Sequence, residues 1–129
     1  MLNCVILHKM NCAVISTARQ VDFIRGDTVS KLRVFIVRHG QTEYNISHRW
    51  QGQLDIPLNE HGQLQAQLIA DYLRKTRFDA IYSSDMRRAY DTATAIADGR
   101  QLTVISDARL REFNLGILQG MTRAEIRAE

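Results

Sequence analysis

One stretch, residues 32–45, constrains the fold of this chain more than any other. It begins with an almost wholly apolar, β-branched run and stops abruptly at Arg38, His39 and Gly40. Such a run predicts a strand buried on both faces of a sheet. Ligands of open α/β sheets bind just beyond the carboxyl ends of strands. We therefore expect a ligand site here, with a guanidinium, an imidazole and a glycine whose backbone can approach an anion closely.

The chain after this stretch alternates between helical and strand patterns. Asn59 and Ser84 are expected to cap two helices, and Thr122 with Glu125 forms a capping box that predicts a third. This alternation predicts an α/β fold with a largely parallel central sheet and helices on both faces. The expected elements are helices over 60–75 and 85–98, strands over 78–83 and 102–105, and a last helix from about residue 123.

The helix expected over 60–75 carries a regular set of large apolar side chains. They are Leu64, Leu68, Ile69, Tyr72 and Leu73. Because these residues recur at helical intervals, we expect their face to pack on the sheet.

Residues 1–31 differ from the chain that follows. They lack a basic segment ahead of their apolar residues, so they match a secretory signal poorly. We interpret them as an extension, disordered or targeting-like, that precedes a partial domain over 32–129. Cys4 and Cys12 have no metal-ligand or C-x-x-C spacing, so we expect free thiols in the reducing cytoplasm, with a mitochondrial presequence as the weaker alternative.

The charge pattern excludes some classes of partner. The 129 residues carry a formal net charge of +3 without a dense basic stripe, so nucleic-acid binding is not expected. No run approaches the roughly 20 apolar residues of a membrane-spanning helix, so no membrane partner is expected either.

Two adjacent arginines lie in an unusual place. Arg87 and Arg88 are expected in the first turn of a helix, where the partial charge of the backbone is already positive. A bound dianion would relieve this conflict, and such conflicts are typical of functional sites. The alternative for both arginines is that they point to solvent, and we favour this alternative for Arg87.

Several spaced motifs resemble the histidine phosphatase superfamily, also called the phosphoglycerate mutase-like family. The resemblance covers about residues 32–125, which corresponds to the amino-terminal part of the family's domain. The motifs are Arg38-His39-Gly40-Gln41-Thr42 with Asn45, Arg49-Trp50-Gln51-Gly52, Asp55-Ile56-Pro57-Leu58, Ser83-Ser84-Asp85 with Arg88-Ala89, and Leu110-Arg111-Glu112 with Gly116 and Gly120.

The resemblance assigns roles to these positions. His39 would be the nucleophile that accepts a phosphoryl group, rather than a core histidine bonded to backbone. Arg38 and Arg88 would bind the phosphoryl oxygens. A second group would line the phosphate pocket, with ordinary loop chemistry as the alternative for each member; it consists of Asn45, Gln51 and Gly52.

Glu112 would be the general acid and base, with a surface ion pair to Arg109 or Arg111 as the alternative. Since the family's chemistry uses protein side chains alone, we expect no metal and no cofactor.

The expected function is hydrolysis of small phosphorylated metabolites through a phosphohistidine. Phosphoglycerate mutase-type transfer is the near alternative, because a mutase shares the nucleophile and differs in the acceptor. A truncated, non-catalytic phosphoester-binding remnant is the other, because the family's second histidine lies in a carboxyl-terminal motif that these 129 residues do not contain. We therefore expect a domain truncated at the carboxyl end.

Overall fold

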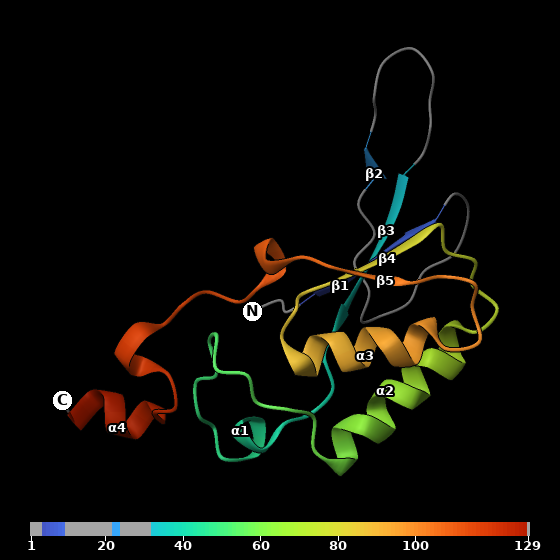
Figure 1. The fold of residues 1–129 in the computed structure, drawn as a ribbon. Coiled ribbons are helices and arrows are strands. Elements are labelled where there is room, and N and C mark those ends of the chain that lie inside the picture. Colours follow the sequence, from blue (N-terminus) through green and yellow to red (C-terminus); the bar gives the residue numbers. More distant parts are fainter. Residues whose placement is uncertain (1–3, 10–21, 24–31, 129) are drawn as a thin grey trace.

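The computed structural model describes residues 4–9, 22–23 and 32–128, which form a five-stranded sheet with two long helices against it (Figure 1). The α/β class predicted from the sequence is confirmed. The strands are β1 (Cys4–Lys9), β2 (Asp22–Phe23), β3 (Leu32–Arg38), β4 (Ala80–Ser83) and β5 (Val104–Ser106). The helices are α1 (Glu43–Ile46), α2 (Glu60–Leu73), α3 (Arg87–Ala97) and α4 (Arg123–Ala128), with 3-10 turns at Ala108–Leu110 and Gly116–Leu118.

The strand order is β2-β3-β1-β4-β5. β1 is antiparallel to both β3 and β4, so β3 and β4 run in the same direction, and β5 pairs parallel with β4. The three strands that follow residue 31 therefore share one direction, as the alternation predicts. The two antiparallel strands come from the first 31 residues.

Part of the expected amino-terminal extension thus belongs to the sheet. β1 pairs with β3 from Cys4 opposite Arg38 to Lys9 opposite Arg33, and β2 pairs with the start of β3. Other residues of the extension, including Cys12, lie outside the described part. Whether residues 1–31 are a separate unit stays a prediction.

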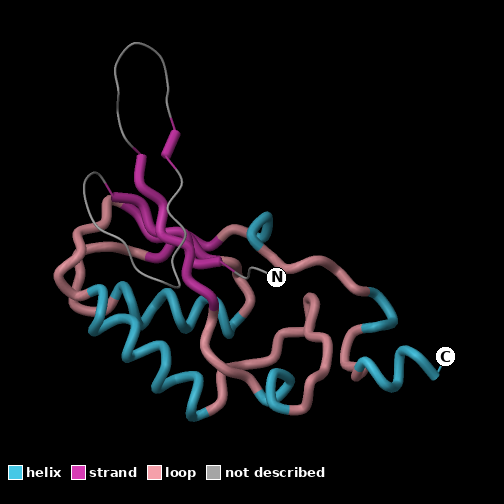
Figure 2. The backbone as a smooth tube through the Cα atoms, turned by 180° about the vertical axis from the view of Figure 1, so that it is seen from behind, coloured by secondary structure: helices cyan, strands magenta, loops and turns pink. Residues whose placement is uncertain are grey.

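The placement of the helices differs from the expectation in one respect. We expected helices on both faces, but α2 and α3 both cover the same face of the sheet (Figure 2). The order of the strands explains this arrangement. The connections from β3 to β4 and from β4 to β5 advance across the sheet in the same direction, so right-handed crossovers place both helices on one side.

The core lies between this face and the helices. Phe35 and Val37 of β3 and Ile81 of β4 are buried against Leu73 of α2 and Ile96 of α3. Alternate residues of a strand face opposite sides of the sheet. His39 therefore lies on the buried side with Phe35 and Val37, and Arg38 is exposed.

The buried face of α2 corrects the sequence interpretation. Leu64, Leu68 and Tyr72 are more than half exposed, whereas the buried positions of this helix hold mostly small residues. A Cβ added at Gly62 would lie 2.0 Å from the carbonyl oxygen of Gln41. The small side chains let α2 approach the loop after β3 closely, which large apolar side chains would prevent. The buried residues of α2 are Gly62, Ala66, Ala70 and Leu73.

The helix starts were predicted with mixed success. Asn59 caps α2 by accepting a hydrogen bond from Gly62 N, as expected. For α3, the Asp55 carboxylate accepts the bond from Arg87 N at 2.7 Å, while the Ser84 hydroxyl bonds to Met86 N instead. Asp55 lies 32 residues earlier in the chain, so a local pattern could not reveal it.

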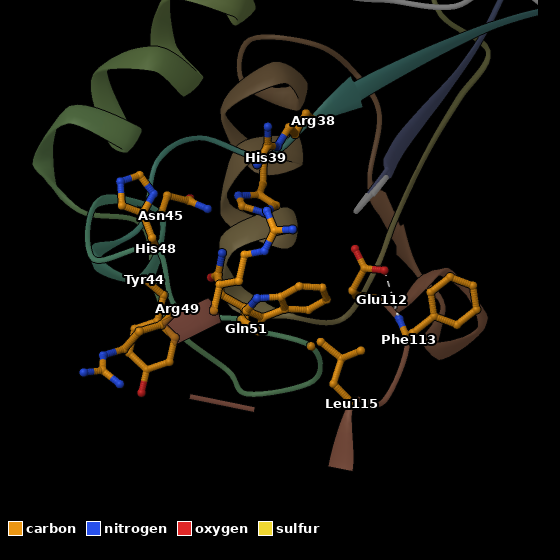
Figure 3. Close-up of a pocket in the computed structure, with 13 residues that line it drawn as sticks. Arg38, His39, Tyr44, Asn45, His48, Arg49, Gln51, Glu112, Phe113 and Leu115 are labelled. Atoms are coloured by element: carbon orange, nitrogen blue, oxygen red, sulfur yellow. Dashed lines mark hydrogen bonds between the residues drawn. The ribbon is translucent and has the colours of Figure 1, made fainter. Parts of the chain in front are cut away.

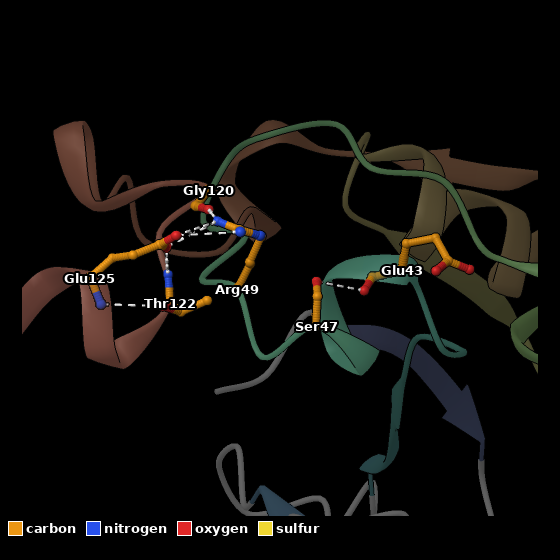
Figure 4. Close-up of polar contacts among 6 residues, drawn as sticks. All are labelled: Glu43, Ser47, Arg49, Gly120, Thr122 and Glu125. Carbon is orange, nitrogen blue, oxygen red and sulfur yellow. Dashed lines mark hydrogen bonds and ion pairs between the residues drawn. The ribbon is translucent and has the colours of Figure 1, made fainter.

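The last helix begins as its capping box predicts. The Thr122 hydroxyl accepts a hydrogen bond from Glu125 N, and the Glu125 carboxylate accepts one from Thr122 N (Figure 4). Arg49 bonds to both the Glu125 carboxylate and the carbonyl oxygen of Gly120, which ties α4 to the loop that precedes Trp50. These contacts place α4, at the end of the described chain, beside the loop that follows α1.

Candidate active site

A cavity of about 580 Å³ opens at the carboxyl end of β3 (Figure 3). Its walls come from the loops after β3 and from the segment after β5, as expected for a site beyond the ends of parallel strands. Six of the seven residues predicted for the site line it, and Arg88 is the exception. The six are Arg38, His39, Asn45, Gln51, Gly52 and Glu112.

The His39 ring is buried, with 9% of the residue exposed. Its Nδ1 lies 2.6 Å from the carbonyl oxygen of Gly40. A carbonyl oxygen can only accept, so Nδ1 carries the proton and Nε2 keeps a free lone pair. Burial lowers the pKa of His39 to about 4, against the raising effect of the Gly40 bond, and the charges of Arg88 and Arg38 lower it further. The imidazole is therefore neutral at neutral pH.

Gly40 fixes the backbone that carries this ring. Gly40 N donates to the Thr92 hydroxyl at 3.2 Å, and that hydroxyl donates to the carbonyl oxygen of Arg88 at 2.8 Å. A Cβ at position 40 would lie 2.2 Å from the carbonyl oxygen of Gly62. The start of α2 and the second turn of α3 thus hold the histidine from both sides.

Arg88 lies behind the wall of the cavity and is fully buried. Its guanidinium donates to the carbonyl oxygens of Leu54 at 2.7 Å and Gly52 at 2.8 Å, while Nε has no hydrogen-bond partner among the described residues. Burial lowers the pKa of Arg88, and the charges of Asp55 and Glu112 oppose this shift. The cation therefore shapes the loop that carries Gly52 and retains an unpaired donor at Nε.

Thr42 organises the amide side chains of the cavity. It is fully buried, and its hydroxyl lies 2.9 Å from Gln51 Oε1, while its backbone N donates to Asn45 Oδ1 at 2.9 Å. Because both amide oxygens are bound to Thr42, the NH₂ groups of Asn45 and Gln51 remain as donors. Two neutral donors in a cavity that Arg38 also lines suit an anionic ligand.

Glu112 faces the cavity from the segment after β5 (Figure 3). Its backbone carbonyl accepts from Gln53 Nε2 at 3.0 Å, and its Oε1 accepts from Phe113 N at 3.1 Å. The alternative interpretation, an ion pair with Arg109 or Arg111, is not observed among the described residues. Arg109 pairs with Asp107, and Arg111 pairs with Asp85.

The structure also adds residues that sequence reasoning missed. Thr42 and Thr92 hold other site residues in place, and the signal for Thr42 was its position at the end of the first motif, two residues after Gly40. Tyr44, Trp50 and Phe113 add aromatic surface to the cavity. Contacts such as that of Thr92 with Gly40 span 52 residues, so the sequence offered no signal for them.

The sequence gives no reason to assign chemistry to Arg87 or His48, and the structure places these two residues differently. Arg87 is exposed, as expected. His48 lines the cavity and has a φ of +53°, a left-handed conformation that few non-glycine residues adopt.

The arrangement can bind a phosphoryl group between cationic and amide donors, with the neutral imidazole of His39 and the carboxyl group of Glu112 facing the same cavity. No cluster of three metal-binding side chains occurs within residues 4–9, 22–23 and 32–128. Over the same residues, no helix is long and apolar enough to cross a membrane.

The chain is similar to curated proteins over part of its length. It is 50% identical over 97 residues to a glucosyl-3-phosphoglycerate phosphatase of Mycobacterium tuberculosis, and the match covers 75% of this chain and 44% of the relative. It is 48% identical over 88 residues to a Yersinia pestis protein named "Probable phosphoglycerate mutase GpmB", covering 68% and 41%. The chain thus spans less than half the length of the curated relatives it matches.

Solved structures agree with these matches. The mycobacterial glucosyl-3-phosphoglycerate phosphatase in complex with VO3 superposes with a TM-score of 0.67 at 51% identity, over 70% of this chain and 45% of the other. A phosphoserine phosphatase from Entamoeba histolytica in complex with 3-phosphoglyceric acid gives 0.65 at 35% identity, with the same coverage.

A family model matches residues 34–129, well over half of the chain, and its description is "Histidine phosphatase superfamily (branch 1)". The match includes every residue predicted for the site. This chain therefore belongs to the histidine phosphatase superfamily, branch 1.

Proposed function

We propose that this protein hydrolyses phosphomonoesters of small phosphorylated metabolites through a phosphohistidine on His39. The protonation state of the His39 ring carries the proposal. A proton fixed on Nδ1 by Gly40, and a pKa lowered to about 4 by burial, leave Nε2 available as a nucleophile at neutral pH. The ring lies at a cavity that also contains Glu112.

The residues supply each part of a two-step reaction. In the first step Nε2 of His39 bonds to phosphorus, the phosphorus–oxygen ester bond breaks, and Glu112 gives its proton to the departing oxygen. In the second step water attacks phosphorus, Glu112 takes a proton from it, and the phosphorus–nitrogen bond breaks. Phosphate leaves, and both side chains return to their starting forms.

The donors around the cavity would stabilise the charge on the phosphoryl oxygens. Arg38 lines the cavity, and the Nε of Arg88 is unpaired behind it. The NH₂ groups of Asn45 and Gln51 complete the set, since their oxygens are bound to Thr42. Such preorganised donors typically provide a large share of the rate enhancement in phosphoryl transfer.

The names of the relatives favour the phosphatase reaction. Two of them are phosphatases of phosphorylated glycerate or serine compounds, and one is named a phosphoglycerate mutase. A mutase would use the same His39 step and transfer the phosphoryl group to a hydroxyl instead of water. We therefore keep mutase-type transfer as the second candidate.

A labelling experiment tests the proposal. The full chain is incubated with a phosphomonoester labelled on phosphorus, quenched in alkali, and assayed for acid-labile label and for released phosphate. We expect label at His39 and phosphate release, both lost in His39→Asn. His61→Asn, at an exposed position in α2, is the matched control and should keep both.

The other outcomes separate the alternatives. If the label moves to an added hydroxyl acceptor and no phosphate is released, the proposed hydrolysis is overturned and mutase-type transfer takes its place as the function. Saturable binding of the ester with no covalent label would overturn both and identify a phosphoester-binding remnant.

A further inference from the structure

A second hollow of about 570 Å³ adjoins the first one at Glu112 and Phe113, which line both. Its other walls come from Gln53, Asn114 and the arginines at 109 and 111. In the proposed reaction Glu112 protonates the oxygen of the leaving group. The atoms of the leaving group that follow this oxygen would therefore lie at the entrance of the second hollow.

Phe113 presents its ring at this entrance. It is 80% exposed, although its backbone N–H is bound to the Glu112 carboxylate (Figure 3). An exposed aromatic ring gains free energy when an apolar surface covers it. The C–H face of a sugar ring is such a surface, and it carries hydroxyl groups around its edge.

The charges of the second hollow disfavour an anionic ligand. Arg109 is paired with Asp107, and Arg111 is paired with Asp85. Both guanidinium charges are thus neutralised by carboxylates. A second phosphate or carboxylate would find no surplus positive charge here.

The amide side chains instead offer one donor and one acceptor. Asn114 Oδ1 accepts from Gly116 N, which leaves its NH₂ group as a donor. Gln53 Nε2 donates to the Glu112 carbonyl, which leaves its Oε1 as an acceptor. A hydroxyl group can donate and accept, so hydroxyls match both atoms.

We propose that the second hollow is a subsite for an uncharged, polyhydroxylated leaving group such as a sugar, with the ring stacked on Phe113 and hydroxyls bonded to Asn114 and Gln53. This assignment rests on the proposed function, because the position of Glu112 in that reaction directs the leaving group into the hollow. Phe113 and Asn114 are then specificity-determining residues.

The sole tryptophan of the chain, Trp50, lines the first cavity, so its fluorescence can report binding without turnover. The probes are methyl phosphate, which has almost no leaving group, glucose 6-phosphate, and cyclohexylmethyl phosphate, which has a similar ring without ring hydroxyls. We expect glucose 6-phosphate to bind about tenfold more tightly than methyl phosphate, with cyclohexylmethyl phosphate between them.

The variants assign this preference to residues. Phe113→Ala should bring glucose 6-phosphate within about twofold of methyl phosphate, whereas Phe113→Tyr, which keeps the ring, should retain most of the preference. Asn114→Ala should weaken glucose 6-phosphate alone, by about threefold. Phe113 and Asn114 are both exposed, so each variant should unfold in urea at the midpoint of the unchanged chain, which shows that it is folded.

Three results would overturn the assignment. They are equal binding of glucose 6-phosphate and methyl phosphate by the unchanged chain, an unchanged preference in Phe113→Ala, and cyclohexylmethyl phosphate binding as tightly as the sugar phosphate. Methyl phosphate binding without discrimination would overturn this assignment alone. No binding of methyl phosphate at all would overturn the proposed function and this assignment together.

Discussion

The two sides of the cavity are built in different ways. The nucleophile side, which we define as residues 38–54 with Arg88, is held by buried groups such as Thr42, His39 and the guanidinium of Arg88. The acid side, which we define as residues 107–122, consists of loops and short 3-10 turns, and its ion pairs lie near the surface. Phe113 and Ile117 on this side are at least 80% exposed.

In the proposed reaction, this difference would give the two sides different tasks. Buried, hydrogen-bonded groups hold a fixed geometry, which suits binding of the phosphoryl group that all phosphomonoesters share. Exposed loops tolerate changes of side chain with little loss of stability, which suits the recognition of a variable leaving group. Mutations on the nucleophile side should therefore affect stability strongly, and mutations on the acid side should not.

The largest effect is expected at Arg88. Arg88→Met removes the hydrogen bonds to the carbonyl oxygens of Gly52 and Leu54 and leaves both without this partner. We expect the free energy of unfolding, measured in urea, to fall by about 3 kcal/mol. Hydrogen bonds to a charged group contribute about 1.5–3 kcal/mol each, and removal of a buried charge offsets part of that loss. Arg87→Met, at the exposed neighbour, is the matched control and should change stability by less than about 0.5 kcal/mol. Equal stability of the two variants would show that Arg88 does not hold the loop.

A pH titration should give the next largest effect. Burial lowers the pKa of His39 to about 4, below its ordinary value of 6.5. As pH falls through this window the unfolded chain binds a proton that the folded chain does not, so stability falls, by about 3 kcal/mol at most. His39→Asn should lose this part of the pH dependence in urea unfolding. NMR should show the His39 ring titrating near pH 4, and inorganic phosphate should raise that midpoint because a nearby anion favours the imidazolium. A midpoint near 6.5 in the free protein would contradict the buried, neutral ring.

A pair of glycine substitutions compares the two sides directly. Gly40→Ala places a Cβ 2.2 Å from the Gly62 carbonyl oxygen, and we expect it to cost about 2 kcal/mol. Gly116→Ala, on the acid side, meets no atom within 4 Å and suffers from its φ of +54° alone, so about 1 kcal/mol is expected. Thermal or urea unfolding measures both. A larger loss of stability for Gly116→Ala than for Gly40→Ala would show that the acid side is the more tightly packed of the two.

The smallest effect is expected at the ion pair beside Glu112. Arg111→Ala breaks the pair with Asp85, yet we expect no resolvable change in urea unfolding, because exposed ion pairs contribute little in water. Release of phosphate from labelled His39 should slow, since the residue next to Glu112 loses its anchor at the end of β4. A clear loss of stability would show that the acid side is as tightly built as the nucleophile side.

Part of the site could be predicted because its signals are local. The apolar run ending at Arg38 and His39 showed where β3 stops and where a ligand site begins, and the cavity lies there. The capping box at Thr122 and Glu125 identified the start of α4 for the same reason. The predicted role of each site residue remains a prediction until the labelling experiment is done.

Other features could not be predicted because they depend on distant residues. The pattern of α2 favoured burial of Leu64, Leu68 and Tyr72, but close approach to the loop after β3 buries the face with Gly62 instead. Periodicity identifies a helix, but which face is buried depends on what it packs against.

The sequence by itself determined the α/β class, the family and the identity of the chemical groups, since these follow from local pattern and spaced motifs. The tertiary structure decided the protonation state of His39, the burial of Arg88 behind the cavity wall and the presence of a second hollow beyond Glu112. The physical reason is that burial and hydrogen bonding depend on groups that the chain brings together from positions up to 76 residues apart.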